Sequence, residues 1–238
     1  MSQQVYRKRR SVFAGIISLL IMLLVAASAW QSPEPSTDKP EVLSAEELAQ
    51  PLASDVLELL PVKGRAPKTG YSRDEFGSGW ASYDGCDVRN RMLASGMTDV
   101  RFGSDECTVL SGQLNDPYTG AVIRFVRGAD TSDSVQIDHV VALSDAWQKG
   151  AQDLSFEDRV VFANDPLNLL AVDGPANQSK SDSDAASWLP PNKSYRCQYT
   201  ARQIAVKSAY NLWLTEAEKA AIKRVLNGCG EQRLPLAT

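Results

Sequence analysis

Short apolar runs bounded by turn residues recur through the middle of the chain, and their length is typical of β-strands. Two of these runs flank the turn DPYTG at residues 116–120, so we expect them to pair as a β-hairpin. Two later runs carry polar residues and are separated by a helical segment. The predicted strands cover residues 108–114, 121–126, 135–143 and 167–172.

Helical periodicity marks the segments between and after these strands. Asp87 is a capping residue for a helix that Gly96 ends, and Thr215 with Glu218 forms a capping box at the start of the last helix. The last two helices are amphipathic and close in sequence, which predicts a helical hairpin in an α+β domain. The predicted helices cover residues 87–94, 156–163, 176–188, 197–210 and 216–227.

The N-terminal segment, residues 1–29, has the pattern of an export signal. A basic stretch precedes an apolar run from Val12 to Ala27, and small residues suited to cleavage follow. The run is somewhat long for a cleaved signal and somewhat short for a span of about 20 residues, so an uncleaved membrane anchor is the alternative. Residues 30–62 predict a linker with a short helix that Pro51 interrupts, and residues 63–238 the folded domain.

The four cysteines all lie beyond the export segment, where disulfides persist. Their spacing is poor for a zinc site, and the sequence alone does not choose among the three pairings that four cysteines allow. Antiparallel packing of the last two helices would bring Cys197 beside Cys229. We therefore predict that pair, together with Cys86 and Cys107.

The charge balance argues against binding through a broad basic surface. The formal net charge is −4, and without residues 1–29, which hold four basic and no acidic side chains, it is −8. Residues 31–63 account for −5 of this, which leaves about −3 for the body from Gly64 onward. Any chemistry on phosphates must then rely on a local site and a metal ion.

Asp138, His139, Asn168 and Asn177 lie in order on a predicted strand, a second strand and the following helix. Cleavage of a phosphodiester needs a nucleophilic water, and a neutral imidazole is well suited to take its proton near neutral pH. His139 is the only histidine of the chain. We therefore expect His139 to be the general base and Asn168 to hold the loop that presents it.

A hard divalent cation bound through oxygen is the expected cofactor, because it offsets the charge that develops on the phosphate. We expect Asp138 and Asn177 to be its ligands, and one Mg²⁺ or Mn²⁺ ion to be preferred. Lys180, one helical turn beyond Asn177, is a candidate phosphate contact. Arg89 is another, although a surface helix face explains Arg89 equally well.

Purely structural roles are the alternative interpretation for these residues. A lone histidine on a strand is more often packed than catalytic, and asparagines are common in turns and caps. A basic stretch at residues 62–73 predicts either a phosphate-facing patch or a solvated loop. Its cations are Lys63, Arg65, Lys68 and Arg73. The tryptophans Trp80, Trp147, Trp188 and Trp213 are expected to pack in the core.

The order of these residues resembles the ββα-metal motif of HNH nucleases. The resemblance implies that His139 is the base, that Asn168 is structural and that Asn177 replaces the usual last histidine as metal ligand. The wider pattern, over about residues 63–226, is similar to a family of exported bacterial proteins described as HNH-type nucleases. Its motifs are KGRAPKTGYSRDEFG, CDVRNRML, LNDPYTG, IDHVVALSDAW, NDPLNLLAVDG and WLPPNKSYRCQY.

The expected fold is therefore a ββα-metal core with an additional β-hairpin and a disulfide-tied C-terminal helical hairpin. The expected function is metal-dependent endonucleolytic hydrolysis of DNA, and secondarily of RNA, by a bacterial protein that is secreted or anchored through residues 1–29. No obligate protein partner is evident. The alternative is an envelope-tethered binding protein that keeps the scaffold with little or no activity.

Overall fold

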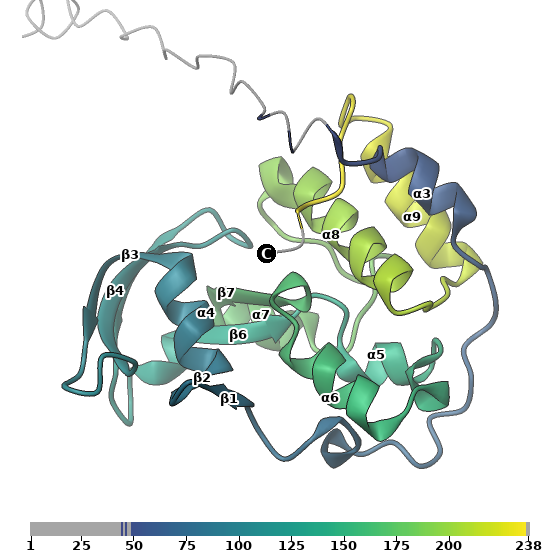
Figure 1. Ribbon diagram of the computed structural model, residues 1–238. Coiled ribbons are helices and arrows are strands. Elements are labelled where there is room, and N and C mark those ends of the chain that lie inside the picture. The colour runs from purple at the N-terminus through teal and green to yellow at the C-terminus, as the bar shows by residue number, and fades with distance from the viewer. Residues whose placement is uncertain (1–43, 45, 47–48, 237–238) are drawn as a thin grey trace, which may run out of the picture. The chain divides into compact units, whose positions relative to one another are not determined.

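The computed structural model describes residues 44, 46 and 49–236. The chain separates into two units, Met1–Val42 and Leu43–Thr238, and every described residue belongs to the second. This unit combines small antiparallel sheets with helices, which is the predicted α+β organisation (Figure 1). Among its described residues, no helix is long and apolar enough to cross a membrane. The predicted export segment, residues 1–29, lies outside the described residues.

A strand–strand–helix unit stands at the centre of the fold. Strands β6 (Val135–His139) and β7 (Leu169–Asp173) pair antiparallel, with His139 opposite Leu169. Helix α7 (Gly174–Lys180) follows β7 directly, because the Asp173 side chain accepts a hydrogen bond from the Ala176 amide and proline stands in the first turn. This is the predicted ββα arrangement.

The expected hairpin is present and gains a third strand. Strands β3 (Met97–Phe102), β4 (Val109–Asn115) and β5 (Val122–Val126) form a sheet in that order. Helix α4 (Val88–Gly96), capped by Asp87, precedes it, and the two-residue strands β1 (Ser82–Tyr83) and β2 (Cys86–Asp87) pair beside it. One apolar cluster joins this sheet to the ββα unit through Leu93, Phe125, Ile137 and Leu169.

The remaining helices lie on the far side of the ββα unit (Figure 1). Helices α5 (Leu143–Trp147) and α6 (Phe156–Asn164) connect β6 to β7. Helices α3 (Ala53–Leu59), α8 (Arg196–Ala209) and α9 (Glu216–Leu226) pack on one another around an apolar cluster. Short 3-10 helices cover Arg73–Phe76, Ser132–Ser134, Ala151–Asp153, Pro166–Asn168 and Lys193–Tyr195.

Two disulfides, Cys86–Cys107 and Cys197–Cys229, give the predicted pairing. The second joins the start of α8 to the segment just after α9, so the C-terminal helices form the expected disulfide-tied hairpin. The first joins β2 to the loop between β3 and β4. The first bridge therefore lies beside the three-stranded sheet, and the second lies within the C-terminal helices.

Two predicted elements are shorter in the structure than the apolar pattern indicated. The strand expected over residues 135–143 ends at His139, because the chain turns there and Leu143 begins α5. The helix expected over residues 176–188 begins at Gly174 and ends at Lys180, since Ser181 adopts a left-handed φ of 51°. The apolar residues beyond both ends pack in the core without continuing the element.

A cluster of buried charges links several helices. Lys149 Nζ lies 2.7 Å from Asp145, 2.8 Å from Asp184 and 2.6 Å from Glu218, and all four side chains are almost fully buried. Lys207 Nζ, on α8, lies 3.0 Å from the other oxygen of Glu218. We call these five residues the buried ion cluster.

Candidate active site

Asp138 and His139 lie at the end of β6, where the strand gives way to an irregular chain. Asn168 is fully buried and holds this irregular segment through three hydrogen bonds. Its backbone carbonyl accepts a hydrogen bond from the Val140 amide at 2.8 Å, and its side chain accepts one from the Val141 amide at 2.8 Å. Its Nδ2 donates to the Val141 carbonyl at 3.3 Å. Asn168 thus ties the segment that follows His139 to the start of β7.

The imidazole of His139 has one engaged and one available nitrogen. Nε2 lies 2.8 Å from the carbonyl oxygen of Ala163. Because a carbonyl only accepts, Nε2 carries the proton and Nδ1 is the basic nitrogen of the neutral ring. Nδ1 has no hydrogen-bond partner among residues 49–236. Trp80 stacks on the ring, with centroids 5.6 Å apart and planes at 12°.

His139 is held in its neutral form at pH 7. Burial lowers the pKa of its imidazole to about 4, against the opposing effect of the Ala163 hydrogen bond, and the cations Arg73 and Lys180 lower it further. The ring is therefore free to accept a proton, as a general base requires.

The carboxylate of Asp138 is buried between two donors. Lys180 Nζ donates to one oxygen at 2.9 Å and the Tyr118 hydroxyl to the other at 2.5 Å. Lys180 also donates to the His139 carbonyl at 2.8 Å and is fully buried. Burial raises the pKa of Asp138, whereas Lys180 and Tyr118 act to lower it. Lys180 therefore faces Asp138 and not the pocket beside it.

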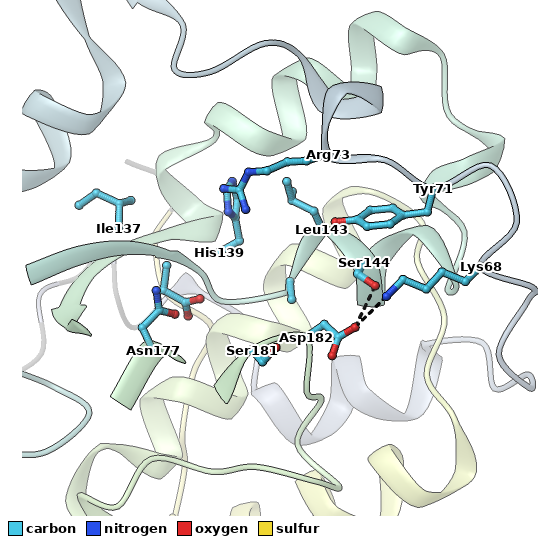
Figure 2. A pocket seen from close by; sticks show the side chains of 12 residues that line it. Lys68, Tyr71, Arg73, Ile137, His139, Leu143, Ser144, Asn177, Ser181 and Asp182 are labelled. Atoms are coloured by element: carbon cyan, nitrogen blue, oxygen red, sulfur yellow. Dashed lines mark hydrogen bonds and ion pairs between the residues drawn. The ribbon is translucent and has the colours of Figure 1, made fainter. Parts of the chain in front are cut away.

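A pocket of about 340 Å³ opens in front of these residues, and we call it the polar pocket (Figure 2). Asn177 faces it from α7, and its Nδ2 donates to Gln136 Oε1 at 2.9 Å, which leaves the amide oxygen for a ligand. The pocket is lined by Lys68, Tyr71, Arg73, Ile137, Asp138, His139, Ala142, Leu143, Ser144, Asn177, Ser181 and Asp182.

Two cations of the predicted basic patch line this pocket. Lys68 forms an ion pair with Asp182 at 3.1 Å. Arg73 makes no side-chain hydrogen bond or ion pair with any residue that the structure describes, and Figure 2 shows it extending towards His139. An unpaired guanidinium beside a neutral imidazole is suited to an anionic ligand such as a phosphate.

The other two cations of the patch serve structural contacts. Lys63 lies over the ring of Trp213, with Nζ 4.9 Å from the centroid. Arg65 pairs with Asp145 at 2.9 Å and with Asp184 at 2.7 Å, and so connects the surface to the buried ion cluster. The sequence signal alone did not separate these two from Lys68 and Arg73.

A second, smaller pocket of about 120 Å³ adjoins the other side of His139. It shares Arg73, His139 and Leu143 with the polar pocket, and its remaining lining is apolar. We call it the apolar pocket. Its lining residues are Arg73, Phe76, Gly77, Gly79, Trp80, His139, Leu143 and Ala163.

Arg89, Trp80 and Tyr118 have positions or contacts that differ from what the sequence indicated. Arg89 is on α4 and is not among the residues that line either pocket. Trp147 packs in a core cluster as expected, whereas Trp80 packs only partly and stacks on His139. Tyr118 belongs to the turn DPYTG, and nothing in its local sequence indicates a partner 20 residues away.

The oxygen donors of the polar pocket suit a hard cation better than a transition metal. Among the described residues, no group of three or more His, Cys, Asp or Glu side chains gathers as a metal cluster. Asp138 and the free amide oxygen of Asn177 both line the pocket. One carboxylate and one amide oxygen are hard donors of the kind that Mg²⁺ takes, and both oxygens of Asp138 also accept hydrogen bonds from Lys180 and Tyr118.

Comparison with known proteins identifies relatives over most of the chain. A family model described as the C-terminal domain of GmrSD restriction endonucleases matches residues 87–225, which is more than half of the chain. A protein of Arthroderma benhamiae, described as an uncharacterized secreted protein, is 38% identical over 212 residues, covering 88% of this chain and 98% of that protein. The match to the family model includes Asp138, His139, Asn168 and Asn177.

Proposed function

This chain belongs to the family of the GmrSD restriction endonuclease C-terminal domain, and from that premise we propose that it is a metal-dependent endonuclease of the HNH type. We propose that it hydrolyses DNA, and secondarily RNA, outside the cytoplasm. Support for this location comes from the export pattern of residues 1–29, the two disulfides and a secreted relative. If residues 1–29 remain uncleaved, the protein is anchored through them.

One observation carries the proposal: the neutral imidazole of His139 lines a pocket beside Arg73, and neither its Nδ1 nor the guanidinium has a partner among residues 49–236. We assign to His139 the deprotonation of the attacking water. As the new P–O bond forms, the water proton passes to Nδ1, the bond between phosphorus and the 3′ oxygen breaks, and the leaving oxygen takes a proton from solvent.

The other residues of the site are assigned to binding and positioning. Asp138 and Asn177 would hold one Mg²⁺ or Mn²⁺ ion, which when bound supplies a hard Lewis acid for the charge on the phosphate. Asn168 holds the segment that presents His139. Arg73, with its unpaired guanidinium, binds the phosphate of the substrate.

Our proposal for Lys180 departs from the sequence-based expectation of a phosphate contact. Its Nζ is fully buried and donates to Asp138 and to the His139 carbonyl. We therefore assign it to holding the Asp138 carboxylate charged and in place. Arg89, which lines neither pocket, is replaced by Arg73 and Lys68 as the phosphate-binding side chains of the proposal.

The first test is nicking of a supercoiled plasmid with Mg²⁺ and with a chelator. Chelation should abolish nicking, and His139→Ala should lower the rate by about two to four orders of magnitude. Tyr210→Phe is the matched control, because it removes a partly buried hydrogen bond to Asp165 outside both pockets and should leave the rate unchanged. Near-normal nicking by folded His139→Ala would overturn the assignment.

The second test concerns the metal. Mg²⁺ or Mn²⁺ should support cleavage better than Zn²⁺, and Asp138→Ala should weaken Mn²⁺ binding measured by calorimetry. Asn177→His adds an imidazole and should shift the metal preference towards Zn²⁺, Co²⁺ or Ni²⁺. An unchanged metal profile for Asn177→His would show that Asn177 is not a ligand.

A binding protein on the same scaffold is the second candidate. It is favoured by the two hydrogen bonds that already engage both oxygens of Asp138, which weaken that carboxylate as a metal ligand. Under this alternative, an oligonucleotide binds to the wild-type protein and stays intact with every divalent metal.

A further inference from the structure

The two pockets beside His139 differ in chemistry although they share a wall. The polar pocket contains cations and hydroxyl, amide and carboxylate groups. The apolar pocket is lined mainly by Phe76, Trp80, Leu143 and backbone, with Arg73 at the boundary. A nucleotide has the same division, with a charged phosphate on one side and a flat, weakly polar base on the other.

We propose that the apolar pocket binds one unpaired nucleobase next to the scissile phosphate, so that the protein acts on single-stranded nucleic acid or on a base extruded from a duplex. This inference rests on the proposed nuclease function and specifies its substrate.

The residues shared by the two pockets determine how a nucleotide is oriented, with its phosphate and its base on different sides. Arg73 and His139 line both pockets, so a phosphate bound by Arg73 and attacked by a water beside His139 lies at their junction. The adjoining base then reaches the apolar side, where the partly buried Trp80 supplies aromatic surface.

Two glycines form part of the lining on this side, and Gly79 has open space beside it. Gly77 and Gly79 line the apolar pocket with φ angles of 95° and 103°, a backbone region that other residues rarely adopt. Around Gly79 no heavy atom lies within 4 Å of the position that a Cβ would take. The lining of the apolar pocket is therefore open at Gly79, where a planar group can enter.

Size and charge both favour an unpaired base. A cavity of about 120 Å³ accepts one ring system and excludes a base pair, so a paired base must leave its stack to enter. The body of the chain from Gly64 onward carries a net charge of about −3, which does not provide the broad basic surface that grips long duplexes. A base subsite supplies affinity that does not depend on such a surface.

The experiment uses a short single strand with one cleavable bond, in which a methylene group replaces the bridging 3′ oxygen at every other position. Two further strands lack the base on the 5′ or on the 3′ side of that bond. Loss of the base that occupies the pocket should lower kcat/KM roughly tenfold, because base–aromatic stacking contributes on this scale. Annealing the intact strand to its complement should also slow cleavage.

Trp80→Ala separates base binding from a mere effect on the orientation of His139. If Trp80 contacts the base, Trp80→Ala should cut the intact and abasic strands at nearly equal rates, and Trp80→Phe should keep most of the difference. Trp213→Ala is the control, since Trp213 lines neither pocket and should leave the tenfold ratio unchanged. Thermal unfolding checks that each variant is folded.

The results distinguish this inference from the proposed function. Cleavage by the wild-type protein that ignores loss of either base, or an undiminished ratio in Trp80→Ala, overturns the base subsite and leaves the nuclease function standing. If the wild-type protein cuts nothing, the nuclease function fails, and fluorescence anisotropy with fully uncleavable strands decides the subsite. Tighter binding of the intact strand that Trp80→Ala abolishes supports the subsite, and equal binding of intact and abasic strands overturns it.

Discussion

The imidazole of His139 is positioned by groups from three separate parts of the chain. Its Nε2 donates to a carbonyl at the end of α6, its ring stacks on Trp80, and Asn168 holds the backbone that follows it. No acidic side chain takes part in these contacts. Burial, more than a charged neighbour, sets its protonation state, and this has a measurable effect on stability.

Stability should fall on acidification because of His139. The unfolded chain binds a proton on this residue near pH 6.5, whereas the folded protein does so only near pH 4. The contribution is complete above pH 6.5 and is lost as pH falls towards 4, by about 3 kcal/mol in total. The difference in free energy of unfolding between wild type and His139→Gln, measured with chelator from pH 7 to 4, should change by this amount. A difference that is independent of pH contradicts it.

Lys180→Met should destabilise the protein through Asp138. The change removes the cation from a buried ion pair and leaves a buried carboxylate with one hydrogen-bond donor, Tyr118, which should cost about 3–5 kcal/mol. The double variant Asp138→Asn/Lys180→Met should recover much of this loss. Urea unfolding measures both. If Lys180→Met keeps full stability and raises only KM, Lys180 is a phosphate contact after all.

At the scale of elements, α7 determines where two site residues lie. It carries both Asn177 and Lys180, and it begins immediately at the end of β7. Gly174 makes this junction possible, because a Cβ there would stand 2.0 Å from the Asp133 carbonyl oxygen. The position of the helix thus depends on one residue without a side chain.

Gly174→Ala should displace α7 or unfold the protein. The clash is with backbone, so it cannot be relieved by rotating a side chain, and a loss above about 3 kcal/mol is expected for such overpacking. Gly64→Ala is the control, since no heavy atom lies within 4 Å of its Cβ position. Thermal unfolding compares the two variants. Equal stability of both would show that α7 does not start as described.

The C-terminal disulfide should contribute substantially to the stability of the helical hairpin. Cys197 and Cys229 are 32 residues apart, and closing a loop of this size restricts the unfolded chain by about 3–4 kcal/mol. The Cys197→Ala/Cys229→Ala variant should lose this amount in denaturant unfolding. Peptide mapping without reduction should recover the Cys86–Cys107 pair in this variant, and free Cys86 and Cys107 thiols would contradict independent formation of the bridges.

Local patterns in the sequence predicted the elements better than the site. Periodicity and caps predicted the start of β6 and the bounds of β7, α8 and α9 to within about two residues, because these signals are local. The end of β6 at His139 was missed, since apolar residues in a turn are indistinguishable from a strand when both are buried. The stacking of Trp80 on His139 and the position of Arg73 beside His139 depend on how distant segments pack together. Periodicity does not encode this packing.

At the scale of the whole unit, the buried ion cluster links α5 to α9, whose apolar residues belong to two different clusters. Its residues come from the α5 region, from the segment after α7, and from α8 and α9. Arg65 extends it to the chain that precedes the polar pocket. Charges at such depth are stable only while all partners are present.

Glu218→Gln should therefore weaken the entire unit. Lys149 and Lys207 each lose an ionic partner in a fully buried position, and we expect a loss of about 3–5 kcal/mol in the free energy of unfolding. Lys223→Met, which breaks an exposed ion pair with Glu58, should leave stability nearly unchanged. Comparable losses in both variants would mean that burial does not increase the contribution of these ion pairs to the free energy of unfolding.

The two disulfides also bear on how the protein reaches its native state. Each joins cysteines that are consecutive in the sequence, Cys86 with Cys107 and Cys197 with Cys229. A chain that crosses a membrane N-terminus first presents the first pair to an oxidant before Cys197 has emerged. Oxidation in order of emergence then yields native bridges directly, so such a chain needs no disulfide isomerase to correct its pairing.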